Sequence, residues 1–140
     1  MNQQLAAALA AEHAAIFAYG AIGARLSGAA RREARETEAA HRSRRDALVI
    51  LLTRDGATPP APEPAYALPH AVTDSAGALR LAVTVEERTA AAWRAALATT
   101  TGAEREQALA GLTDCAVRAT RFRRTAGTTP ATVPFPGRQT

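Results

Sequence analysis

Four ionisable side chains occupy helical positions at which a core residue is expected, and any chemistry of this chain would start from them. Glu12 lies in the first apolar seam, Glu38 and His41 in the second, and Glu86 in the third. A buried carboxylate is costly unless an arginine, a hydroxyl, an imidazole or a metal ion accompanies it. Glu38 and His41 are three residues apart, which places a carboxylate and an imidazole on one helix face, as di-iron bundles require. The spacing therefore poses the question of which partner neutralises each charge.

Two proline-free stretches must position the first three of these residues. Residues 2–26 carry a seam at steps of three and four, and residues 29–54 form a second stretch that ends before Gly56. The first seam consists of Leu5, Leu9, Glu12, Ile16, Tyr19, Gly23 and Leu26, and the second of Ala34, Glu38, His41, Arg45, Leu48 and Leu52. The short break at residues 27–28 predicts an antiparallel pair of helices.

Residues 55–72 cannot be helical, because prolines recur through them. These are Pro59, Pro60, Pro62, Pro64 and Pro69. In extended geometry of about 3.1 Å per residue the segment reaches about 50 Å, more than the roughly 38 Å of a helix of about 25 residues. A simple hairpin needs only a few residues. The segment therefore predicts a crossover along the bundle, which makes the second and third helices parallel.

Two further helices follow the crossover. Asp74 and its neighbours are N-cap candidates for the third, and Thr101 and Glu104 have the spacing of a capping box for the fourth. The seams are Leu79, Val83, Glu86, Ala90, Trp93, Leu97 and Thr100 in the third helix, and Ala108, Leu112, Cys115, Ala119 and Phe122 in the fourth. We expect one all-α four-helix bundle over residues 1–127 and an extended tail over residues 128–140.

The composition agrees with close-packed helices. Of the 140 residues 37 are alanine and only 4% are aromatic, which excludes a β-sandwich. Cys115 is the single cysteine, so no internal disulfide can form, and on its seam it is expected to be inert packing. No leader pattern opens the chain and no apolar run reaches about 18 residues, so we expect a cytoplasmic protein without a membrane segment. The net charge of +4, from arginine alone, is too modest to predict nucleic-acid binding.

The register of the first hairpin predicts how the charges pair. If that hairpin turns near residue 28, Glu12 faces Arg44 and Arg45 and lies about one helical turn from His41. We therefore expect Glu12 to pair with one of these two arginines. Arg45 is the one that belongs to the predicted seam of the second helix. Such a pair would fix the register of two helices without any reaction.

Tyr19 belongs to the same predicted polar core, with Glu38 or His41 bonded to its hydroxyl. The two halves of the chain also echo each other. When the first seam glutamate is laid on Glu86, Tyr19 falls on Trp93. The match is short, and it suggests that each half is an antiparallel helix pair.

Four helices, a long crossover, a seam glutamate on helices one and three and Glu-x-x-His on helix two resemble the ferritin-like superfamily. The segment 9–20, Leu-Ala-Ala-Glu-His-Ala-Ala-Ile-Phe-Ala-Tyr-Gly, is similar to an actinobacterial ferritin-like domain of unknown function, the DUF4439 family. The resemblance implies metals that handle dioxygen or ferrous iron. Their ligands would be Glu12, Glu38, His41 and Glu86. Helix four reads Asp114-Cys115-Ala116-Val117 where that pattern has Glu-x-x-His, and Asp114 is turned about 100° from the seam. One metal thus lacks its histidine.

These observations predict a non-catalytic, oligomerising or ligand-binding bundle with a degenerate metal site and no resident cofactor. The alternative is an iron-dependent oxidase or iron-handling protein that uses the four ligands just named. A second alternative is a basic, nucleic-acid-associated protein that uses the arginines of residues 118–124. Small residues at Gly20, Gly23 and Ala24 allow a close helix approach and predict a homodimer. The identity of any small-molecule ligand stays open.

Overall fold

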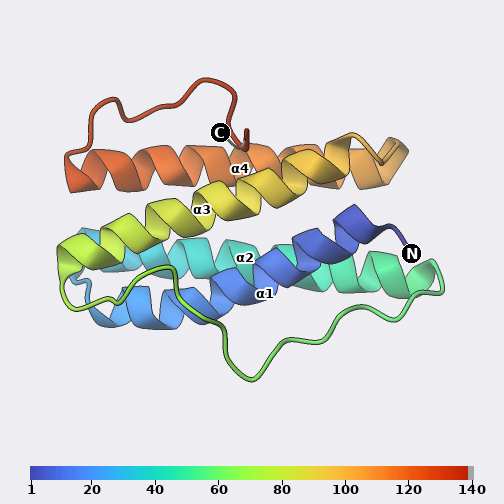
Figure 1. Ribbon diagram of the computed structural model, residues 1–140, viewed down its shortest axis with the longest axis horizontal. Coiled ribbons are helices and arrows are strands. Elements are labelled where there is room, and N and C mark those ends of the chain that lie inside the picture. The colour runs from blue at the N-terminus through green and yellow to red at the C-terminus, as the bar shows by residue number, and fades with distance from the viewer. Residues whose placement is uncertain (139–140) are drawn as a thin grey trace.

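The computed structural model describes residues 1–138, which contain four α-helices and no strand. α1 spans Gln3–Ala24, α2 Gly28–Arg54, α3 Ser75–Leu97 and α4 Gly102–Ala126. This confirms the predicted all-α four-helix bundle. The segment between α2 and α3 runs back along the molecule, so that these two helices point in the same direction (Figure 1). α1 packs against α2 and α3, and α4 packs mainly against α3.

The helix ends follow local chemistry in most places. The side chain of Asp74 accepts a hydrogen bond from the backbone N–H of Gly77 at the start of α3. Gly127 ends α4 in the left-handed conformation with φ 75°. Thr101 is the N-cap residue of α4, but its side chain makes no capping hydrogen bond. The predicted capping box with Glu104 is therefore wrong.

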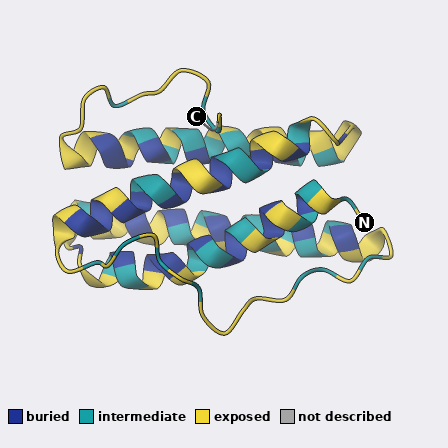
Figure 2. Ribbon diagram, in the orientation of Figure 1, coloured by how far each residue is buried: buried dark blue, intermediate teal, exposed yellow. Residues whose placement is uncertain are grey.

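Two apolar clusters fill the bundle, one at each end, and a polar layer lies between them. The cluster at the α1–α2 turn includes Ile22, Leu81 and Phe122, and the cluster at the other end includes Leu9, Leu52 and Trp93. Buried positions recur along each helix between exposed ones (Figure 2). A layer of charge in the middle of the bundle is thus sealed by apolar side chains on both sides.

Gly111 lets α3 and α4 approach each other closely. A Cβ at this position would lie 2.7 Å from the Trp93 ring, so only glycine leaves room for the indole against α4. Trp93 is 1% exposed as a result. The sequence pattern placed Leu112 on this seam, whereas the structure buries Gly111 and leaves Leu112 half-buried.

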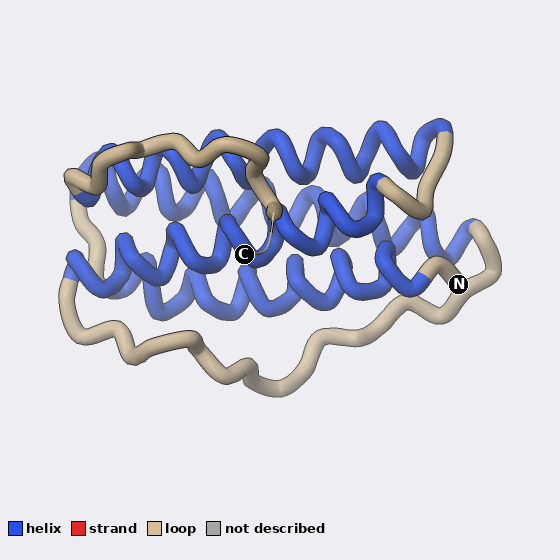
Figure 3. Tube along the Cα trace, turned by 45° about the horizontal axis from the view of Figure 1, so that its top comes forward, coloured by secondary structure: helices blue, strands red, loops and turns tan. Residues whose placement is uncertain are grey.

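After α4, the residues up to 138 form neither helix nor strand, contain a turn at residues 136–137, and fold back over α3 and α4 (Figure 3). At the other end of the chain, α1 is long and apolar enough to cross a bilayer by length and composition, with a mean hydropathy of 1.5. Half of the residues in the 18-residue stretch that gives this value are buried inside the bundle. Core helices and leader sequences also meet this criterion, so hydropathy alone does not assign α1 to a membrane.

Candidate functional site

His41 of α2 lies in the polar layer and bonds carboxylates from two other helices. Its Nδ1 is 2.5 Å from Oε2 of Glu12 on α1, and its Nε2 is 2.7 Å from Oε2 of Glu86 on α3. All three side chains are 0% exposed. Burial alone lowers the pKa of His41, but the Glu86 charge and the hydrogen bonds to both carboxylates outweigh it and raise the pKa to about 9. The ring is therefore an imidazolium that donates from both nitrogens.

Arg44 brings a second cation from the next turn of α2. Its Nε donates to Oε1 of Glu12 at 2.8 Å, and its Nη1 donates to Oδ2 of Asp114 on α4 at 2.5 Å. Nη2 of Arg44 also lies 3.0 Å from Nδ1 of His41, and a hydrogen bond between them would require Nδ1 to be unprotonated. The shorter contact between Nδ1 and Glu12 requires a proton on Nδ1, so Nη2 does not donate to it. Burial alone raises the pKa of Glu12, while His41 and Arg44 together bring it below its ordinary value.

Asp114 connects the cluster to α4. Its Oδ2 accepts from Arg44 and, at 2.8 Å, from Nε of Arg118. Arg118 in turn donates to the Thr37 hydroxyl at 3.1 Å. Burial raises the pKa of Asp114, but the hydrogen bonds from Arg118 and Arg44 lower it further than burial raises it. The sequence prediction missed Asp114 because it lies off the apolar seam; its i, i+4 spacing with Arg118 was the available signal.

Two aromatic side chains complete the cluster with a reciprocal pattern. The Tyr19 hydroxyl on α1 donates to Oε2 of Glu86 on α3 at 2.7 Å. The Trp93 Nε1–H on α3 donates to Oε1 of Glu12 on α1 at 2.8 Å. Each aromatic stands seven residues after the glutamate of its own helix and bonds the glutamate of the other. The sequence echo between the two halves thus corresponds to a real exchange of hydrogen bonds.

The formal charges of the cluster cancel. Three carboxylates face three cations, namely Glu12, Glu86 and Asp114 against His41, Arg44 and Arg118. One oxygen stands apart, because Oε1 of Glu86 is buried and has no hydrogen-bond partner within residues 1–138. The cluster is therefore neutral as it stands, and Oε1 of Glu86 is its one buried acceptor without a donor among the described residues.

A family model described as a domain of unknown function (DUF4439) matches residues 4–140. The chain belongs to this family. A solved structure titled as that of a conserved hypothetical protein, rv2844, from Mycobacterium tuberculosis is 38% identical to this DUF4439 chain, with a TM-score of 0.86. The match covers 89% of this chain and 95% of that chain. No curated protein matches. Neither description states an activity.

Two residues predicted for the polar core of this DUF4439 chain lie outside it. Glu38 is half-buried and pairs with Arg42 at 3.7 Å, and Arg45 pairs with its neighbour Asp46 at 2.9 Å. Arg44 takes the inward position that the seam gave to Arg45. The placement of Glu38 and Arg45 in the core is thus corrected, because α2 is rotated relative to the predicted seam.

The predicted offset between Glu12 and His41 is also wrong. The hairpin register placed them about one turn apart, yet Glu12 bonds both His41 and Arg44. These two residues are three apart on one face of α2, so the two oxygens of a single carboxylate reach both. Tyr19 bonds Glu86 instead of Glu38 or His41. One carboxylate therefore joins two turns of α2 that the sequence pattern treated separately.

The residues of this DUF4439 chain do not fit a di-metal centre. Both nitrogens of His41 are donors to carboxylates, and an imidazolium has no lone pair for a metal. The guanidinium of Arg44 lies between Glu12 and Asp114 and already pairs with both carboxylates. Glu38, the remaining candidate ligand, is turned toward Arg42. The metal ligands inferred from the family resemblance are therefore not brought together as a set.

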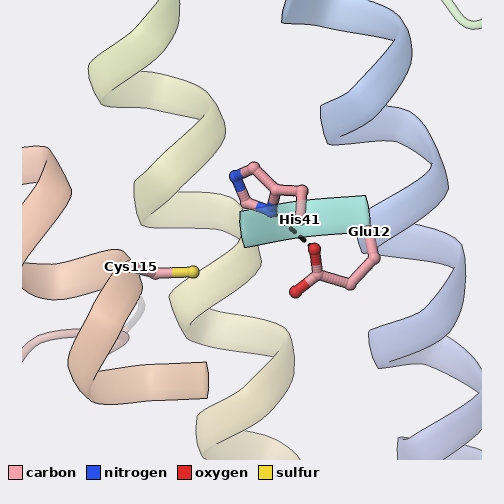
Figure 4. Close-up of side chains that lie close together, drawn as sticks. All are labelled: Glu12, His41 and Cys115. Atoms are coloured by element: carbon pink, nitrogen blue, oxygen red, sulfur yellow. Dashed lines mark hydrogen bonds and ion pairs between the residues drawn. The ribbon is translucent and has the colours of Figure 1, made fainter. Parts of the chain in front are cut away.

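A smaller donor group is present nonetheless. One ligand atom each of Glu12, His41 and Cys115 lies within 4.8 Å of the other two, and all three residues are buried. The Cys115 sulfur points toward the Glu12–His41 pair (Figure 4). Burial raises the pKa of the Cys115 thiol well above its ordinary value, and the Glu86 charge adds to the effect. The thiol is thus protonated and unreactive unless a metal ion replaces its proton.

Proposed function

We propose that this DUF4439 chain is a non-catalytic, ferritin-like binding domain in which an internal ion cluster takes the place of a di-metal centre. The observation that supports this most directly is the doubly bonded imidazolium of His41. A proton and a guanidinium supply the positive charge that a metal would otherwise bring to Glu12 and Glu86. The cluster then holds helices together and performs no reaction.

The state of the other groups agrees with this proposal. A general acid or base needs a pKa near the working pH and a path to substrate. The pKa of Tyr19 is raised well above its ordinary value by burial and by the Glu86 charge, and Cys115 is affected in the same way. Glu12 is fully buried, with both oxygens engaged by donors. None of these groups is set up to exchange a proton with a substrate.

Metal analysis of protein purified without chelator tests the proposal. We expect less than about 0.2 equivalents of any transition metal, and no change in the melting temperature when a chelator is added, because the native cluster is already neutral. One or two tightly bound equivalents, with a melting temperature that falls on chelation, would contradict it.

A second candidate function is a mononuclear metal site, which the donor group of Glu12, His41 and Cys115 favours. A thiolate, an imidazole and a carboxylate form a ligand set that suits Zn²⁺. Binding would displace the protons of His41 and Cys115, so metal addition should release acid. Titration with Co²⁺ should then produce a thiolate absorption band in the wild type and none in Cys115→Ala. Absence of the band and of proton release would remove this candidate.

A homodimer and a cytoplasmic location belong to the same proposal. Gly20 and Gly23 have no atom within 4 Å of an added Cβ, so this face of α1 is open for a second copy to approach. Light scattering should give twice the chain mass. The nucleic-acid alternative has less support, because Arg118 and Arg123 are held by Asp114 and Glu87.

A further inference from the structure

One end of the bundle gathers the ends of all four helices. The turn between α1 and α2, the start of α3 and the end of α4 lie together there (Figure 1). Exposed arginines of the four helices and their caps stand within about two helical turns of this end. Six of them make no ion pair within residues 1–138, and we call these six the basic end: Arg25, Arg31, Arg32, Arg35, Arg80 and Arg124. They are far apart in the sequence, and the fold brings them together.

The basic end accounts for the excess charge of the whole chain. Two carboxylates in the same turns, Glu36 and Asp74, make no ion pair within residues 1–138, and a third, Glu33, pairs with Arg121 at 3.6 Å. Six arginines against the first two carboxylates leave four positive charges, and the formal net charge of the chain is +4. The rest of the chain is therefore close to neutral, and the positive charge is concentrated on one end.

The fold itself does not require these arginines. Elsewhere on α4, Arg118 and Arg123 are held by carboxylates, which the basic end lacks. Arg31, Arg32 and Arg35 lie near the N-terminal end of α2, where the helix dipole disfavours cations, and the first turn of α2 holds no acidic residue. Like charges gathered on one end also repel one another. The basic end thus opposes the stability of the fold until an anion neutralises it.

The spread of the six arginines favours a polymer over a small anion. They come from four neighbouring helices, whose axes in a bundle lie about 8–10 Å apart, so a single phosphate group reaches only one or two of them. Duplex DNA carries one negative charge per about 1.7 Å of its axis. A guanidinium group binds phosphate oxygens in bidentate fashion. A phosphate backbone therefore contacts several of these side chains at once.

The surroundings of the arginines distinguish a duplex from other polyanionic partners. The exposed large apolar side chains of residues 1–138 lie outside the first two turns of α2 and α3 and the last two turns of α1 and α4. A lipid surface needs apolar side chains that insert, a protein interface needs an apolar centre, and single strands stack their bases on aromatic rings. The basic end offers none of these within the described part of the chain, so a duplex backbone fits it best.

We propose that the basic end binds the phosphate backbone of double-stranded nucleic acid without regard to base sequence. Its arginines form charge-assisted hydrogen bonds with phosphate oxygens on one side of the duplex. The inference goes beyond the proposed function, because none of the six arginines belongs to the internal ion cluster.

Fluorescence anisotropy of a labelled DNA duplex of about 20 base pairs tests the proposal at several salt concentrations. The logarithm of the binding constant falls by about 0.9 per phosphate contact for each tenfold rise in salt, so three to six contacts predict a slope of about −3 to −5. A second duplex of unrelated sequence should bind equally well, since backbone contacts carry no sequence information. A slope shallower than about −1, or no binding at about 50 mM salt, would overturn the proposal.

Two double variants with the same change in net charge locate the surface. Arg31→Gln with Arg35→Gln should weaken binding at least about tenfold at about 0.1 M salt and flatten the slope by up to about 2. Arg54→Gln with Arg105→Gln changes the opposite end, where residues 54–55 and 104–106 carry three carboxylates and two arginines, and should leave the slope unchanged. Equal losses in both double variants would show that net charge alone attracts the duplex and would refute the basic end as the surface.

Two further probes test the choice of partner. Vesicles that contain about 20% phosphatidylserine should bind more weakly than the duplex, because the basic end has no large apolar side chain to insert. Polyglutamate should also bind more weakly, because an extended chain carries at most about one charge per 3.5 Å. Tighter binding of either probe would overturn the assignment to nucleic acid. Melting temperatures of the variants close to that of the wild type should accompany these results, since the substituted side chains make no ion pair in the described chain.

Discussion

The free energy of unfolding should fall as the pH rises from 6.5 to about 9, because His41 holds a proton in the folded protein that the unfolded chain releases in this range. The pKa of an ordinary histidine is 6.5, and that of folded His41 is about 9. Below 6.5 both states carry the proton and the stabilisation is complete. Within the window only the folded state is protonated, so each increase in pH favours unfolding.

The magnitude follows from the contacts of the ring. The difference between 6.5 and about 9 corresponds to about 3 kcal/mol at roughly 1.4 kcal/mol per pH unit. This is a large part of the stability of a domain of this size, which is about 5–15 kcal/mol. The groups facing the ring are Glu12 and the Tyr19 ring from α1, Glu86 from α3, Arg44 on its own helix and the Cys115 thiol from α4. The raised pKa of Cys115 keeps its thiol protonated in the fold throughout the window.

Urea denaturation followed by circular dichroism, repeated between pH about 6 and about 9, measures the effect. His41→Gln keeps a side chain of similar size without a titrating group, and its unfolding free energy should be nearly constant across the window. His70→Gln in the crossover is the matched control and should keep the fall of the wild type. A wild-type change below about 0.5 kcal/mol, or an NMR titration that shows a neutral His41 ring at neutral pH, would refute the imidazolium assignment.

Gly111→Ala should destabilise the fold by about 1–3 kcal/mol and shift the Trp93 fluorescence, since the new methyl group collides with the indole; Gly23→Ala, also helical but with open space around it, should be neutral or slightly stabilising. Denaturation curves of both variants check this, and equal effects would contradict it. Gly137→Ala should release the tail, seen as faster amide exchange, because its Cβ meets the Ala90 carbonyl. Gly56→Ala has nearly the same φ, 82° against 79°, and no such contact, so it should cost only the backbone strain of about 1–2 kcal/mol and leave the tail protected.

The order and direction of the helices could be predicted because helix-breaking residues separate them clearly. Prolines between residues 59 and 69 exclude a helix there, and the observed α2 and α3 end and begin outside that segment. The length of the crossover then fixes the direction of α3. Three seam positions, Glu12, His41 and Glu86, are also fully buried as the periodicity indicated. Helix-breaking residues and the spacing of buried positions depend only on neighbouring residues, so they can be recognised in a single sequence.

The rotation of α2 could not be obtained in the same way. Ala34, His41 and Leu48 are buried, and the steps of three and four between them allow either Thr37 or Glu38 as the intervening inward residue. The cost of burying the side chain decides between Thr37 and Glu38. The Thr37 hydroxyl can be buried because it donates to the carbonyl of Glu33 in its own helix at 2.8 Å. A glutamate there would need a partner from another helix. The same ambiguity separates Arg44 from Arg45.

The buried polar layer supplies a register that the apolar clusters cannot. Alanine-rich faces of α1 and α3 present similar methyl groups at successive turns, so sliding one helix by one turn, about 5.4 Å, would still allow apolar contact. The same shift would break the bond from Tyr19 to Glu86 and the bond from Trp93 to Glu12 together. Both carboxylates would then be buried with fewer donors, which is far more costly than imperfect apolar packing. We infer that the cluster selects one alignment of α1 on α3, and that this requirement accounts for charged residues at positions where leucine would otherwise be expected.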